Sequence, residues 1–205
     1  MKKLQNNGKP CTANCSDMEK DLRNALKVLR TGGLILYPTD TVWGIGCDAT
    51  REDSVERIYR LKQRAEKQSM LILVDTVDRI YSYVDPVPEI AIDLMEVADK
   101  PLSIVFSGAR NLASNLMAHD GSIGIRVCRD PFCLELIKRF RKPLVSTSAN
   151  LHGEPPPSCF AEIGKPILQG VDYTVTWRQD DTTRAAPSDI IRIGPGGEVK
   201  ILRKS

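Results

Sequence analysis

The spacing of apolar residues alternates along the chain between one typical of amphipathic helices and one typical of short buried strands. A first group recurs every three or four residues and stops at Gly32-Gly33, namely Met18, Leu22, Ala25, Leu26 and Leu29. This spacing predicts a helix with one buried apolar face. The next residues, Leu34 to Tyr37, form a continuous apolar run, which predicts a buried strand that ends at Pro38.

Helical and extended patterns keep alternating through the rest of the chain. Helical spacing is found over residues 53–64, 88–98, 110–117 and 132–140. Extended segments are expected over residues 70–74, 103–106, 123–127, 144–146, 173–177, 189–193 and 199–203. Gly194-Pro-Gly-Gly197 separates the last two segments and favours a hairpin. The predicted class is therefore α/β (α+β), with a twisted mixed β-sheet flanked by helices and functional loops at strand ends.

Length and composition indicate one globular domain. The chain has 205 residues, 41% of them apolar and 27% charged, which is typical of neither disordered nor membrane proteins. Residues 1–16 are polar and lack periodicity, so we expect a flexible N-terminal arm followed by one domain over residues 17–205. No window is long enough for a membrane span, and the N-terminal segment lacks the apolar core of a signal peptide.

Cysteine and charge usage narrow the chemistry further. Six cysteines without a CxxC pair, and only two histidines, argue against a zinc site or a disulfide framework. Reduced thiols in a cytoplasm fit better, and we expect no membrane partner. The net charge is only +3, so any preference for anions has to come from local clusters such as the six basic residues between Ser122 and Val145.

Three loops combine hydroxyl residues with nearby cations. The loop from Thr39 to Gly46 follows a predicted strand and carries two threonines and two glycines, so it could hold a ligand against its backbone or be no more than a polar turn. Lys62 and Arg64 lie at a predicted helix end, where such a pair suits a polyphosphate, although surface pairs of this kind are common.

The third loop, Ser146-Thr-Ser-Ala-Asn150, follows an apolar strand. Buried hydroxyls need partners, which raises the odds that a polar ligand or a phosphate binds there. Arg126 lies inside another apolar strand, where a guanidinium is costly unless it is paired or binds an anion. No residues suggest a nucleophilic triad, and no Walker motif is present, so an ATP site would be built from dispersed hydroxyls and cations.

Six motifs, taken in order, resemble those of the YrdC/Sua5 family, whose members make threonylcarbamoyl-adenylate for the t6A modification of tRNA. These motifs are Pro38-Thr-Asp-Thr-Val-Trp-Gly-Ile-Gly-Cys-Asp-Ala49, Lys62-Gln-Arg64, Gly124-Ile-Arg-Val127, Lys142-Pro-Leu-Val-Ser-Thr-Ser-Ala-Asn150, Pro187-Ser188 and Ile201-Leu-Arg203. The resemblance covers about residues 17 to 203. It implies a short, single-domain member with a YrdC/RibB-like fold and a ligand cleft.

The same resemblance implies the site residues and the reaction. Residues that would contact threonine are Thr41, Arg126, Ser146 and Ser188. Residues that would contact ATP are Arg64, Gln68, Ser122, Ser148 and Arg203. Lys62 would support the phosphates, and Lys62 and Arg64 are the expected catalytic pair. The implied enzyme is a nucleotidyltransferase that uses L-threonine, bicarbonate and ATP with Mg²⁺, and that supplies the t6A transferase machinery downstream.

Two other functions and one local alternative stay open at this point. A module that binds double-stranded RNA or tRNA is weakly supported by the basic residues between Arg126 and Lys142. A relative that adenylates a carbamoyl group in metalloenzyme maturation would share the fold. Arg126 could bind the carboxylate of threonine, or it could pair with a carboxylate of the protein itself, such as Asp130 or Asp189.

Overall fold

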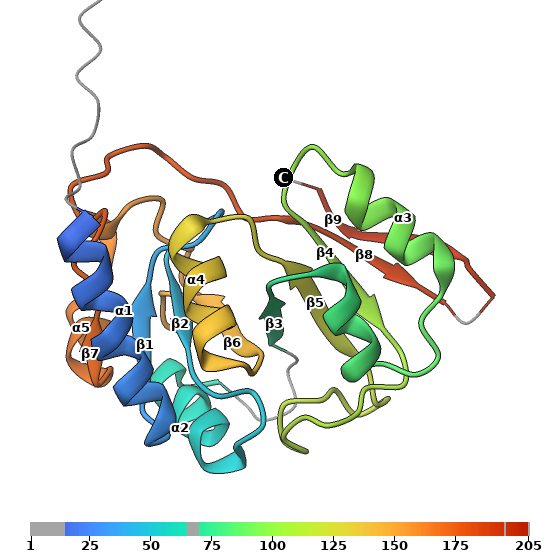
Figure 1. The fold of residues 1–205 in the computed structure, drawn as a ribbon, viewed down its shortest axis with the longest axis horizontal. Helices are drawn as coiled ribbons and strands as arrows, with labels where there is room; N and C mark the ends of the chain where they lie inside the picture. The colour runs from blue at the N-terminus through green and yellow to red at the C-terminus, as the bar shows by residue number, and fades with distance from the viewer. Residues whose placement is uncertain (1–14, 65–69, 195, 205) are drawn as a thin grey trace, which may run out of the picture.

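The computed structural model describes residues 15–64, 70–194 and 196–204 (Figure 1). Its first helix, α1 (Cys15–Arg30), buries the apolar stripe expected from the sequence and packs against α4 (Pro131–Phe140). Asp130 caps α4 by accepting a hydrogen bond from the backbone N–H of Cys133 at 3.0 Å, and Pro131 occupies the first turn. The apolar residues of both helices therefore join one core.

The central feature of the described part of the chain is a nine-stranded mixed sheet. In chain order its strands are β1 (Ile35–Tyr37), β2 (Gly44–Gly46), β3 (Leu71–Val74), β4 (Leu102–Phe106), β5 (Ile123–Val127), β6 (Leu144–Ser148), β7 (Tyr173–Thr174), β8 (Asp189–Ile193) and β9 (Val199–Arg203). Across the sheet the order is β7-β1-β2-β6-β3-β5-β4-β8-β9. The pairs β1–β7, β3–β5 and β4–β8 are parallel and the other pairs are antiparallel, so the prediction of a mixed sheet is confirmed.

The remaining helices lie between strands. They are α2 (Glu52–Lys62), α3 (Glu89–Val97) and α5 (Lys165–Gly170), with two short 3-10 helices, η1 (Val77–Ser82) and η2 (Phe160–Glu162). In the view of Figure 1, α3 lies over the half of the sheet that contains β4, β8 and β9, whereas α1, α2, α4 and α5 lie in the other half. None of the helices in the described part of the chain is long and apolar enough to cross a membrane.

Close packing at β2 explains why the Thr39–Asp48 segment contains a strand that its sequence does not suggest. Gly-Ile-Gly has little strand propensity, and we expected a loop. In the structure β2 is wedged between β1 and β6. A Cβ at Gly46 would lie 2.6 Å from the Tyr37 ring and 2.7 Å from the carbonyl oxygen of Val145, so only glycine allows the strands to approach this closely.

Two further predictions are wrong. Residues 110–117 form turns instead of a helix, because Asn111 has a left-handed φ of 56° and the N–H of Ala113 donates to the carbonyl of Ala49 at 2.9 Å. The extended segment expected over residues 173–177 is a strand only at Tyr173–Thr174. The other predicted helices and strands are confirmed within a few residues, including the hairpin β8–β9.

Candidate functional site

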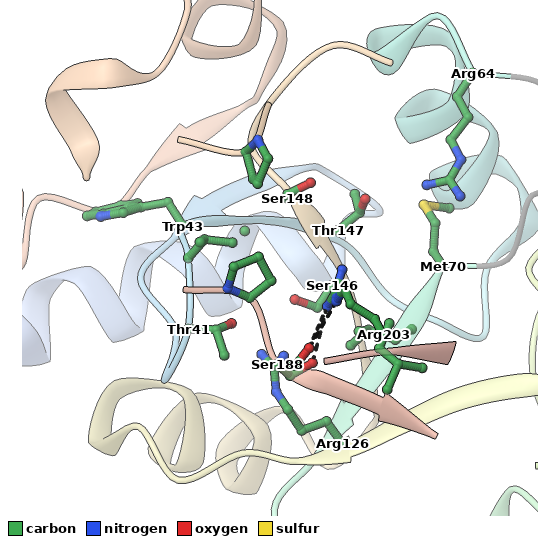
Figure 2. A pocket seen from close by; sticks show the side chains of 16 residues that line it. Thr41, Trp43, Arg64, Met70, Arg126, Ser146, Thr147, Ser148, Ser188 and Arg203 are labelled. Carbon is green, nitrogen blue, oxygen red and sulfur yellow. Dashed lines mark hydrogen bonds between the residues drawn. The ribbon is translucent and has the colours of Figure 1, made fainter. Parts of the chain in front are cut away.

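A pocket of about 250 Å³ opens over the middle of the sheet (Figure 2). Its lining comes from segments far apart in the sequence: the loop before β2, the end of α2, strands β3, β5 and β6, and the hairpin β8–β9. The lining residues are Thr41, Val42, Trp43, Gly44, Arg64, Met70, Leu71, Arg126, Ser146, Thr147, Ser148, Pro156, Pro187, Ser188, Ile190 and Arg203. The fold therefore assembles most of the polar residues that the sequence motifs singled out.

Sheet register places the polar residues of β5 and β6 on the two sides of β3. Leu71 of β3 lies opposite Ser146 of β6, and Leu73 lies opposite Arg126 of β5. Because β3 is the strand between β5 and β6, the serine and the arginine approach the pocket from its two sides. The alternating residues of these strands, such as Ile72 and Ile125, are fully buried in the core.

The loop before β2 is held in one conformation by its own threonines. The Thr39 hydroxyl lies 3.0 Å from the Thr41 hydroxyl and 2.8 Å from the carbonyl of Val42, and it accepts the N–H of Thr41 at 3.0 Å. Thr39 thus acts as a local brace, and Thr41 is left on the pocket wall. Trp43 follows on the same wall and packs against Phe160, with ring centroids 4.9 Å apart.

Positive charge dominates the pocket. Arg64, Arg126 and Arg203 all line it, and no Asp or Glu is among the lining residues that the structure describes. Burial lowers the pKa of Arg203, and the nearby guanidinium of Arg126 acts in the same direction. Burial also lowers the pKa of Arg64. Because Arg126 and Arg203 lie close enough to affect one another, an anionic ligand between them would offset their mutual repulsion.

Arg126 is only 3% exposed and has a partner that the sequence did not indicate. Its Nη2 lies 3.0 Å from Oδ1 of Asp40, whereas we had named Asp130 or Asp189 as protein partners. The carboxylate of Asp130 pairs with Arg178 at 2.7 Å instead. Asp40 reaches Arg126 because the Pro38–Thr41 loop folds over the end of β5, a contact that no local pattern reveals.

The hairpin β8–β9 brings Ser188 and Arg203 together. The Nε and Nη2 of Arg203 donate to the carbonyl oxygen of Ser188 at 3.0 and 2.9 Å, as the dashed lines of Figure 2 show. The hydroxyl of Ser188 lies 2.8 Å from that of Ser103 on β4. Ser103 supports a lining residue without lining the pocket itself. The sequence did not single it out, because one serine in an apolar strand carries no signal of its own.

The end of α2 separates the two cations of Lys62-Gln-Arg64. Gln63 adopts a left-handed conformation with φ of 51°, which ends the helix. The buried ammonium of Lys62 donates to the carbonyls of Ser148 and Asn150, so it supports the end of β6 from outside the pocket lining. Burial, followed by the charge of Arg64, lowers the pKa of Lys62 to about 8. Arg64 lines the pocket itself.

The structure thus brings together seven of the predicted site residues and leaves others apart. Those that line the pocket are Thr41, Arg64, Arg126, Ser146, Ser148, Ser188 and Arg203. The hydroxyl of Ser122 donates to Asp120 at 2.6 Å, and Ser122 is not in the lining. Gln68 lies outside the described residues. Sequence reasoning passed over the apolar wall of the pocket, which includes Met70 and Pro156.

Comparisons with known proteins show the family to which the chain belongs. The profile of the Sua5/YciO/YrdC family, described as telomere recombination, matches residues 27–205. A protein of Pseudoalteromonas translucida named threonylcarbamoyl-AMP synthase is 33% identical over 155 residues, which are 74% of this chain and 82% of that protein. Another of the same name, from Xanthomonas euvesicatoria, is 31% identical over 192 residues, or 87% of this chain and 96% of that protein.

A solved structure shares the fold. The structure of P. abyssi Sua5 complexed with L-threonine matches this chain with a TM-score of 0.77 at 22% sequence identity. The match covers 89% of this chain and 53% of the other, so this chain spans about half the length of that Sua5.

Proposed function

This chain belongs to the Sua5/YciO/YrdC family, and we propose that it is an L-threonylcarbamoyladenylate synthase that serves the t6A modification of tRNA. The observation that carries the proposal is the pocket lining, in which three arginines and five hydroxyl side chains converge without an acidic residue among those described. The relatives named threonylcarbamoyl-AMP synthase, of which the alignments cover most, support the same activity and a transferase-type enzyme.

The threonine end of the pocket is proposed to lie between β5 and the loop before β2. Arg126 would bind the carboxylate of the amino acid, since a guanidinium forms strong charge-assisted hydrogen bonds with carboxylates. Thr41, Ser146 and Ser188 line the same part of the pocket and offer hydroxyls to the amine and hydroxyl of threonine. The complex of P. abyssi Sua5 with L-threonine supports the proposal of a threonine site in this fold.

The ATP end is proposed to lie toward Arg64, Ser148 and Arg203. Figure 2 shows Arg64 entering the view from the end of α2, apart from the group formed by Arg126 and Ser188. This separation gives the triphosphate a cation of its own in Arg64 and leaves Arg126 for the carboxylate, while Arg203, which is bonded to Ser188, adjoins both ends. Lys62 would add positive charge nearby while it supports the carbonyls of Ser148 and Asn150.

The proposed reaction needs no nucleophile from the protein. The amine of threonine attacks the carbon of bicarbonate, and loss of water gives the carbamate. A carbamate oxygen then attacks the α-phosphorus of ATP, the bond to the β-phosphate oxygen breaks, and pyrophosphate leaves. Such a transfer depends on positioning and on stabilising negative charge, which fixed arginines and hydroxyls supply. This reaction is what makes the enzyme a nucleotidyltransferase.

Mg²⁺ is proposed to arrive with the nucleotide. The described lining offers hydroxyls but no carboxylate, so it suits an ion that phosphate oxygens and waters already hold. The ion would neutralise phosphate charge, while Arg64 and Arg203 would orient the triphosphate. The product is proposed to pass to the t6A transferase machinery. Direct binding of tRNA draws little support from the basic residues Arg139 and Lys142, because Arg139 pairs with Glu19 and Glu135 and Lys142 pairs with Asp48.

Pyrophosphate release is expected to require threonine and bicarbonate together. The purified protein is assayed with Mg²⁺ and ATP, with each co-substrate omitted in turn, and with serine or valine in place of threonine. The hydroxyls of the pocket should favour threonine over valine, because valine has a methyl group in place of the threonine hydroxyl and would leave a pocket hydroxyl without a hydrogen-bond partner. Equal turnover without threonine or without bicarbonate would refute the proposed function.

ATP affinity is expected to fall as the pH rises through about 8. The ordinary pKa of a lysine is 10.5, and that of Lys62 is about 8. Between pH 8 and pH 10.5 Lys62 is therefore mostly neutral, whereas a lysine in free solution is still charged. In calorimetry from pH 7 to 9 we expect the wild-type Kd to increase about two- to fivefold. Lys62→Met should give weaker binding and a flat profile. The exposed Lys138→Met variant should follow the wild type, and parallel profiles for all three proteins would contradict this role.

A further inference from the structure

Asp40 lies beside the pocket floor in direct contact with the pocket arginine. Its Oδ1 lies 3.0 Å from Nη2 of Arg126, and its Oδ2 accepts the backbone N–H of Arg129 at 3.2 Å. Both side chains of the ion pair are nearly inaccessible, at 4% for Arg126 and 9% for Asp40. Asp40 itself is not part of the pocket lining, so it reaches the ligand only through Arg126.

The hydrogen bonding of this pair is incomplete on both sides. Among the residues that the structure describes, neither Nε of Arg126 nor Oδ1 of Asp40 has a hydrogen-bond partner, although both atoms are buried. The 3.0 Å contact is therefore an electrostatic one without good hydrogen-bond geometry. A buried guanidinium with donors to spare is costly in a purely structural ion pair, but it suits an arginine that has still to bind a carboxylate.

The surroundings hold Asp40 in place. The Thr39 hydroxyl braces the loop on one side of it, as described above, and the thiol of Cys133 on α4 donates to the carbonyl of Pro38 on the other. Asp40 also bridges the loop and the end of β5 through the N–H of Arg129. A carboxylate that is carried on a braced loop and bonded to the N–H of Arg129 can in turn fix the guanidinium that it contacts.

We propose that Asp40 is a positioning residue for threonine binding: it holds the guanidinium of Arg126 toward the side of the pocket formed by Thr41 and Ser188 and keeps its positive charge compensated when the pocket is empty. Figure 2 shows the Arg126 side chain extended in that direction. The inference rests on the proposed function, because it assigns the specific anion that Arg126 receives. Asp40, which lies between Thr39 and Thr41, would therefore affect threonine binding only through Arg126.

A double-mutant cycle tests this role. Threonine and ATP affinities are measured by calorimetry for the wild type, Asp40→Asn, Arg126→Gln and the double variant, together with threonine KM and kcat from pyrophosphate release. Asp40→Asn should raise the threonine Kd about tenfold and Arg126→Gln about a hundredfold, while the ATP Kd changes less than about threefold. In the double variant Asp40→Asn should add nothing to the effect of Arg126→Gln, because its effect passes through that side chain.

Two features keep the test decisive. The double variant leaves no uncompensated charge, so it reports on binding even if Asp40→Asn alone lowers the melting temperature. Asp85→Asn removes an exposed carboxylate that pairs with Arg110 at 3.1 Å far from the pocket lining, and it should leave both affinities within about twofold of the wild type.

Each other outcome overturns the inference. Additive losses in the double variant would show that Asp40 acts independently of Arg126. Tighter threonine binding in Asp40→Asn would show that Asp40 competes with the threonine carboxylate for Arg126 instead of positioning the guanidinium. Unchanged threonine affinity in a folded Asp40→Asn would refute the role while leaving the proposed function intact, whereas a wild-type protein that binds no threonine would refute the proposed function itself.

Discussion

Replacing Asp21 with alanine is expected to lower the free energy of unfolding by about 3–5 kcal/mol, the largest effect on stability that we predict. The carboxylate of Asp21 is 1% exposed on the inner face of α1. It accepts hydrogen bonds from the Tyr173 hydroxyl, from the N–H and hydroxyl of Thr176 at 2.9 Å each, and from the N–H of Trp177 at 2.7 Å. Alanine would leave these partly buried donors without the acceptor that holds them against α1.

Chemical denaturation followed by circular dichroism measures this loss, and thermal unfolding should show a fall in melting temperature of about 10 °C. Asp17→Ala is the matched control, since Asp17 is exposed in the first turn of the same helix and contributes about 0.3–1 kcal/mol through the helix dipole. Equal stability of the two variants would show that water replaces the carboxylate and that Asp21 does not anchor this part of the chain.

The contacts of Asp21 also explain why the strand predicted over residues 173–177 was too long. The residues from Tyr173 onward are rich in strand formers, and the local pattern continues to Trp177. In the structure the N–H groups of Thr176 and Trp177 are taken by Asp21, so they cannot continue the ladder of β7 with β1. The competing acceptor lies about 150 residues away in the sequence, where no local pattern can indicate it.

Elements with strong local signals were predicted well, and those made by distant packing were not. β3 is a continuous apolar run, β5 is apolar except for Gly124 and Arg126, and α2 and α4 have clear helical spacing, so their existence follows from the chain alone. β2 is a strand because β1 and β6 enclose it. The segment 110–117 has helical spacing, yet its backbone is used to dock against Ala49.

The site residues also fall into those that the sequence indicates and those that only distant contacts reveal. The hydroxyl and arginine residues of the pocket were found because they fall in motifs of a known family. The structure brings residues from these separate motifs into one pocket. Asp40 was quoted within a motif but given no role, because its importance depends on contact with Arg126 on another strand. Ser103 has no motif at all, and only its hydroxyl contact with Ser188 identifies it.

Replacing Arg64 with alanine is expected to weaken ATP binding about 10- to 100-fold, or ~1.5–3 kcal/mol, which is the range for a charge-assisted hydrogen bond to phosphate. The left-handed turn at Gln63 directs Arg64 into the pocket lining while Lys62 stays beneath β6. Calorimetric titration with the Mg²⁺ complex of ATP measures the loss. Threonine affinity should change much less, because Arg126 serves the carboxylate separately.

The choice of control for Arg64→Ala follows from the structure. Arg57 belongs to the same helix, but it donates to both carboxylate oxygens of Asp172, at 2.9 and 2.8 Å, and to the carbonyl of Gly32. Its removal would therefore disturb the packing of α2. Arg60, whose side chain is 76% exposed and pairs only locally with Glu56, is the better control, and Arg60→Ala should leave ATP affinity within about twofold of the wild type. If Arg64→Ala proved as silent as Arg60→Ala, the triphosphate would have to lie elsewhere in the pocket, and the division into a threonine end at Arg126 and an ATP end at Arg64 would be wrong.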